Sequence, residues 1–121
     1  MGDRVSVQFK NGEDTSVVLF NHWGGMGFVE EVKKWVKNFE MHVIANWKHK
    51  NHSTPITRCD VENLMVQFIA SLGKHEKDHN FNQMVSHSLY LGKTQNDGDN
   101  SDNGHHIIEV GDLKRKFEDL E

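Results

Sequence analysis

Every second side chain is apolar at the start of the chain. Over residues 4–9 the apolar positions are Val5, Val7 and Phe9. This period of two predicts a strand that is buried on one face only. A turn signal follows at residues 11–14, and the β-branched, apolar run 15–20 predicts a return strand. We therefore expect the chain to open with a β-hairpin.

The period then changes from two to between three and four. Residues 28–47 carry one apolar stripe, formed by Phe28, Val32, Trp35, Val36, Phe39, Val43 and Trp47. Asp60 is a good N-cap for a second helix, and Gly73 is placed to end it. The stripe of this helix contains Val61, Leu64, Met65, Phe68, Ile69 and Leu72. Both segments are predicted to be amphipathic helices.

Two further strands are predicted at residues 86–91 and 105–110, joined as a second hairpin across a long polar tract. Residues 112–121 have apolar positions at helical spacing and predict a short C-terminal helix, either docked or frayed. The order β-β-α-α-β-β favours an α+β fold: a four-stranded antiparallel sheet with two helices packed on one face. With 121 residues, the chain fits a single domain over residues 1–121.

Charge and composition narrow the classes of function. The net charge of -4 argues against nucleic-acid binding, because such proteins usually carry a basic surface that displaces counterions. The apolar runs are too short for a membrane span, and the first residues lack the apolar core of a signal peptide. Cys59 is the only cysteine, which suits a reducing compartment, so we predict a cytoplasmic protein.

The polar tract 96–104 is the first candidate site. Its oxygen-bearing side chains alternate along the chain, so an extended backbone would direct several of them to one side, as a calcium site requires. The candidate ligands are Asp97, Asp99, Ser101, Asp102 and Asn103. Residues 99–104 match the first half of an EF-hand loop, but the second half fails, because Val110 stands where the closing glutamate would be. The alternative is a polar connection whose Asp-Gly and Asn-Gly pairs form turns.

The glycine-rich corner 21–27 is the second candidate site, because a strand leads into it and a helix leads out of it. Backbone N–H groups at such a helix start can hold an anion, and an aromatic ring there can stack on a base. The candidate ligand-binding residues are His22, Trp23, Gly24, Gly25 and Gly27. The corner lacks the Gly-Lys-Ser/Thr of a phosphate-binding loop. The favoured interpretation is a tight turn in which the glycines adopt positive φ and Trp23 caps the core.

Catalytic motifs are weak. Residues 75–79 match the His-Glu-x-x-His pattern of zinc proteases, but they follow the predicted helix end and lack a third ligand. His49, His52 and Cys59 form a poor zinc set, and no nucleophilic triad can be argued from spacing. We therefore lean against an enzyme.

A β-hairpin that runs into Asn21-His22-Trp23-Gly24-Gly25 and a helix resembles a group of small uncharacterised proteins of prokaryotes and their phages. The resemblance covers the first third of the chain. It departs at Met26-Gly27-Phe28, where typical members have acidic residues. The resemblance implies the hairpin-helix arrangement and supplies no catalytic residue.

These patterns favour a non-enzymatic module that binds a protein partner through the tail helix and the rim around Trp23. Two alternatives stay open: a divalent cation such as calcium at residues 97–103, and an anion or nucleotide at residues 21–27. If the third strand ran parallel to the second, the two candidate sites would share one end of the sheet. If it ran the other way, the acidic tract would lie beside the Asn11-Gly12 turn.

Overall fold

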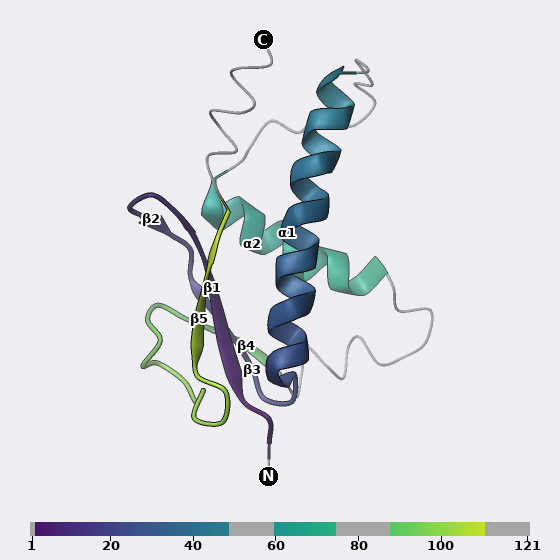
Figure 1. The fold of residues 1–121 in the computed structure, drawn as a ribbon. Helices are drawn as coiled ribbons and strands as arrows, with labels where there is room; N and C mark the ends of the chain where they lie inside the picture. Colours follow the sequence, from purple (N-terminus) through teal and green to yellow (C-terminus); the bar gives the residue numbers. More distant parts are fainter. Residues whose placement is uncertain (1, 49–59, 75–87, 111–121) are drawn as a thin grey trace.

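The computed structural model describes residues 2–48, 60–74 and 88–110 (Figure 1). The fold is α+β, as predicted, with five strand segments and two helices in this part of the chain. In chain order the elements are β1 (Val5–Asn11), β2 (Asp14–Thr15), β3 (Val18–Asn21), α1 (Gly25–Lys48), α2 (Val61–Lys74), β4 (Leu89–Gly92) and β5 (His105–Glu109). The predicted helix at residues 112–121 lies outside the described residues, as do the motif at 75–79 and the set His49, His52 and Cys59.

The first hairpin forms as predicted, with an interruption in its second strand. β1 pairs antiparallel with β2 at Lys10↔Thr15 and with β3 at Val7↔Leu19. Two residues of β1 lie between these pairs and three residues lie opposite them, so the return strand contains a bulge. Ser16 occupies the bulge, where its Oγ accepts a 3.0 Å hydrogen bond from the Phe9 N–H.

The second predicted hairpin does not form. β4 pairs antiparallel with β3 at one edge of the sheet, whereas β5 pairs parallel with β1, from Ser6↔His105 to Lys10↔Glu109. β1 therefore lies between β3 and β5, and the sheet is not wholly antiparallel. The prediction was wrong because alternation identifies a strand without identifying its partner.

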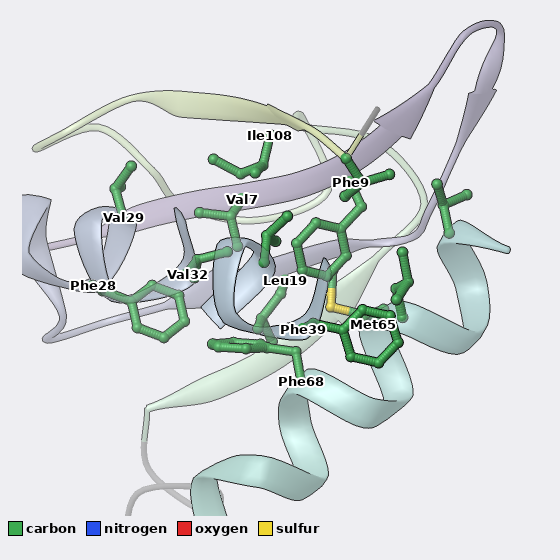
Figure 2. Close-up of a cluster of buried hydrophobic side chains, with 14 of the residues drawn as sticks. Val7, Phe9, Leu19, Phe28, Val29, Val32, Phe39, Met65, Phe68 and Ile108 are labelled. Atoms are coloured by element: carbon green, nitrogen blue, oxygen red, sulfur yellow. The ribbon is translucent and has the colours of Figure 1, made fainter. Parts of the chain in front are cut away.

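Both helices contribute to one hydrophobic core with the face of β1 that carries Val5, Val7 and Phe9 (Figure 2). Leu19 and Ile108 add the neighbouring strands to this cluster. The predicted stripes are confirmed where side chains are described: the buried helical residues are Phe28, Val29, Val32, Val36, Phe39, Val61, Leu64, Met65 and Phe68. No helix in the described part of the chain is long and apolar enough to cross a membrane.

The N-termini of the two helices can be compared with the starts predicted from the sequence. At α2 the Asp60 carboxylate accepts a 3.1 Å hydrogen bond from the Asn63 N–H, which confirms the predicted N-cap. α1 begins at Gly25, three residues before the predicted start at Phe28. The prediction placed all the glycines of residues 21–27 in the turn before the helix. Gly25 is instead the first residue of α1, with φ of 60° and an N–H that donates to the Asp3 carbonyl at 2.9 Å.

Segment 93–104, which connects β4 to β5, lies on the side of the sheet away from α1 (Figure 1). Phe20 and Tyr90 stack beneath it, with ring centroids 4.9 Å apart. A Cβ added to Gly98 would lie 2.5 Å from the Tyr90 ring and 2.8 Å from the Phe20 ring. Gly98 is thus required for close packing, and the polar tract forms the cover of the second face of the sheet.

Candidate functional site

The corner between β3 and α1 is fixed by hydrogen bonds on both sides. The Asn21 side-chain oxygen accepts a 3.0 Å hydrogen bond from the Trp23 N–H, which closes a tight turn. His22 donates its N–H to the Ser88 carbonyl at 2.8 Å and accepts one from the Asp3 N–H at 2.8 Å. The corner is thereby held to the start of β4 and to the N-terminal segment, which gives it a rigid backbone.

Trp23 projects from this rigid corner. Trp23 is 56% exposed, and within the described part of the chain the His22 ring packs against it, edge-on at 4.5 Å between centroids. Met26, in the first turn of α1, is 44% exposed. The prediction that Trp23 caps the core is therefore wrong, because more than half of this residue is exposed to solvent.

The predicted calcium residues do not converge on one point. Asp97 caps its own turn by accepting hydrogen bonds from the N–H groups of Lys93 at 2.8 Å and Thr94 at 2.9 Å. These bonds, that from Thr94 first, lower the pKa of Asp97. Asp99 and Asp102 instead bind Arg4.

Arg4 holds the rest of the tract in place. Its Nη1 lies 2.5 Å from the Asp99 carboxylate, and its Nε and backbone N–H both donate to Asp102, at 2.8 and 3.0 Å. The bond to Asp102 raises the pKa of Arg4, and the same bond lowers the pKa of Asp102. The pKa of Asp99 is lowered mainly by its bonds to Ser101. Ionised carboxylates and a guanidinium therefore form this cluster at neutral pH.

The cluster leaves little basis for a metal. Arg4 already occupies the position between Asp99 and Asp102 where a cation would be needed. In residues 2–48, 60–74 and 88–110, no group of three or more His, Cys, Asp or Glu side chains is arranged to hold a metal ion. The geometry thus supports the alternative interpretation, a polar connection, and calcium binding stays a prediction without structural support.

The acidic tract and the corner nevertheless meet. The Asn103 side chain donates to the Asp3 carboxylate at 2.7 Å, and Asp3 is bonded to the corner through Gly25 and His22. His22 is also close enough to lower the pKa of Asp102. β4 runs antiparallel to β3, for which we expected the tract beside Asn11-Gly12. That expectation was wrong, since segment 93–104 crosses the sheet and ends beside the corner.

The anion hypothesis receives no support at Gly25. The N–H of Gly25 is already donated to the Asp3 carbonyl, and a Cβ added to Gly25 would collide with the Asp3 carboxylate. A bound phosphate would face that negative charge. Gly24 has a packing role as well, because a Cβ there would lie 2.6 Å from both the Asn21 side chain and the Phe28 Cβ. Gly27 has open space around its Cα.

A chain of polar groups follows the second face of the sheet. Asn100 donates to the Ser6 Oγ at 2.9 Å, Ser6 lies 2.7 Å from the His105 Nδ1, and the His105 Nε2 lies 3.1 Å from the Gln8 side-chain oxygen. Gln8 in turn donates to the Ser16 carbonyl at 2.9 Å. All these contacts are satisfied when neutral His105 carries its proton on Nε2 and accepts the Ser6 hydroxyl proton on Nδ1. Burial lowers the pKa of His105, and the neighbouring His106 lowers it further.

Sequence reasoning missed Asp3, Arg4, Ser6, Asn100 and His105 as members of these clusters. Each of them pairs with residues about one hundred positions away, or with groups that do, and no local pattern signals such a pairing.

No protein-family model, curated protein or solved structure matches this chain. The structure does contain the hairpin-helix order on which the resemblance to small prokaryotic and phage proteins was based, and membership of that group stays a prediction.

Proposed function

We propose that this protein is a non-enzymatic module that binds a protein partner through the corner around Trp23. The observation that supports the proposal is a tryptophan that is 56% exposed on a backbone fixed by hydrogen bonds. Tryptophan is enriched among the residues that dominate binding energy at interfaces. A side chain presented from a rigid backbone also loses little conformational entropy when it binds.

The arrangement closest to a catalytic one among the described residues supports the same view. Ser6, His105 and Gln8 form a continuous hydrogen-bonded chain, as a nucleophile and its base would. However, Ser6 is 0% exposed, and segment 93–104 bonds to its hydroxyl through Asn100. A substrate cannot reach that oxygen in this structure, so the chain of bonds serves the fold.

Site-specific photocrosslinking tests the proposal. A photoreactive phenylalanine analogue placed at Met26, beside Trp23 in the sequence, is expected to crosslink a partner in a lysate of the protein's own cells. Val66, which is 63% exposed on α2, is the matched control position. The partner is then purified, and its affinity is measured for the wild type, Trp23→Ala and Val66→Ala.

Trp23→Ala is expected to weaken binding by about 2 kcal/mol or more, roughly thirtyfold, as at other tryptophan anchors. Val66→Ala should bind as the wild type does. Crosslinks that form equally at Met26 and Val66, or an affinity that Trp23→Ala leaves unchanged, would overturn the proposal.

A further inference from the structure

The surface next to Trp23 carries more negative than positive charge. Asp3 is exposed, and the side chains of Asp99 and Asp102 are 48% and 34% exposed. Arg4 is the cation recorded in ion pairs with this group, and its side chain is 29% exposed. Among the described residues of this group, three carboxylates and one guanidinium leave an excess of two negative charges at this side of the corner.

Two structural links connect these charges to the tryptophan. The Asp3 backbone is hydrogen-bonded to both flanks of Trp23, at the His22 carbonyl and the Gly25 N–H, and the Asp3 carboxylate lies against Gly25. Asp102 lies on the same side, because it accepts a 3.0 Å hydrogen bond from the backbone N–H of Arg4, the residue that follows Asp3. The exposed ring and the carboxylates therefore belong to one surface.

An exposed indole beside an excess of negative charge favours one chemistry of ligand. The face of an indole ring attracts a cation, most often a guanidinium, and nearby carboxylates increase that attraction. An acidic partner would be repelled, and a purely apolar partner would gain nothing from the carboxylates.

We propose that the Trp23 corner binds a basic segment of its protein partner, with an arginine side chain lying against the indole ring and attracted by Asp3 and Asp102. This inference rests on the proposed function, because it specifies the partner of the same surface. The carboxylates contribute long-range attraction, while Trp23 provides the contact.

The test uses a short capped peptide that contains two arginines in a glycine-serine context. Its binding to the full chain is followed by two-dimensional nuclear magnetic resonance, with the Trp23 indole signal assigned from Trp23→Phe. Two matched peptides serve as controls. In one, citrulline replaces both arginines, which keeps the shape and removes the charge; in the other, glutamate replaces them.

The arginine peptide is expected to shift the Trp23 indole signal and the amides of Gly24 and Gly25, with millimolar affinity that falls as salt rises. Trp23→Ala should abolish the amide shifts of Gly24 and Gly25, Trp23→Phe should retain part of these amide shifts, and Val66→Ala should leave all shifts unchanged. Asp3→Asn, which keeps an oxygen to accept the Asn103 bond, should weaken binding about two- to threefold.

Equal shifts with the citrulline peptide, or none with the arginine peptide, would overturn this inference. The proposed function fails separately, because it depends on a partner captured at Met26 and lost in Trp23→Ala. A partner that meets those criteria but binds without basic residues would leave the module intact and refute only its preference for arginine.

Discussion

At the residue scale, packing can require a glycine that the sequence pattern alone would assign to a turn. Gly98 belongs to an Asp-Gly pair, which we interpreted as a turn signal or as part of a cation loop. The φ of Gly98 is not positive, whereas Gly12, Gly25 and Gly104 are the described glycines with positive φ. What Gly98 provides is the absence of a Cβ above Phe20 and Tyr90. Such a requirement involves a strand that is distant in sequence, so no local pattern reveals it.

Gly98→Ala is expected to destabilise the fold by about 1–3 kcal/mol, the usual cost of overpacking, because both aromatic rings must move. Gly27→Ala is the matched control, since nothing lies within 4 Å of its added Cβ. Urea unfolding of both variants checks the comparison. A Gly98→Ala variant as stable as Gly27→Ala would show that segment 93–104 does not pack on the rings.

His105 gives the fold a pH dependence of known sign. Its pKa in the folded state is lowered by burial and then by His106, so the unfolded chain takes up the proton more readily. The stabilisation is therefore fully present above the unfolded pKa of about 6.5 and is lost as pH falls towards the lower folded pKa.

His105→Gln should lose less stability than the wild type over that pH range, as measured by thermal unfolding at a series of pH values. His106→Gln is the control at the neighbouring position, where the ring nitrogen instead contacts the Asn103 carbonyl. Parallel pH curves for the wild type and His105→Gln would contradict the expectation.

At the scale of elements, local signals located the helices and strands well. The alternation of Val5, Val7 and Phe9 and the stripes of both helices place the core on the predicted faces. Pairing is a different matter. Residues 105–110 alternate too weakly to specify which edge they join, and the contacts that decide it come from Arg4 and Ser6. The surroundings of the candidate sites were unpredictable for the same reason, because Asp99 and Asp102 bind Arg4 from the segment before β1.

The capping prediction can be tested at α2. Asp60→Ala is expected to cost about 1 kcal/mol, because the Asn63 N–H loses its acceptor at the helix start. Asp60→Asn keeps a side-chain oxygen and should cost far less. Chemical denaturation measures both, and equal losses for the two variants would assign the effect to the charge of Asp60 rather than to its hydrogen bond.

Arg4 joins the N-terminal segment to segment 93–104, so Arg4→Ala is expected to free that segment from the sheet. Amide hydrogen exchange at residues 99–103 should become faster, while exchange in the core of α2 changes little. Arg4→Lys keeps the charge but cannot bond Asp99 and Asp102 with a planar guanidinium. Its exchange rates at residues 99–103 should therefore lie between those of the wild type and Arg4→Ala. Unchanged exchange in Arg4→Ala would mean that the loop is held by its other bonds alone.

The described parts of the chain share one core, to which strands and helices both contribute. β5 is the last strand of this part of the chain, and Ile108 on it is 5% exposed, whereas its neighbour Ile107 is 51% exposed. If the whole sheet unfolds as one unit, a cavity under β5 should weaken every element together.

Ile108→Ala is expected to lower the free energy of unfolding by about 2–4 kcal/mol, and Ile107→Ala by less than about 1 kcal/mol. Circular dichroism and tryptophan fluorescence should report a single shared transition in both variants. Transitions that separate in Ile108→Ala would show that β5 unfolds independently of the helices.

The parallel pairing of β1 with β5 also determines when the molecule can finish folding during its synthesis. β1 leaves the ribosome well before β5, the strand that completes one of its edges, because β5 follows about one hundred residues later. Until then the nascent chain exposes a hydrogen-bonding edge and part of an apolar face, a state prone to misassociation. The final step closes a very long loop, which favours slow completion of an early hairpin-and-helix intermediate.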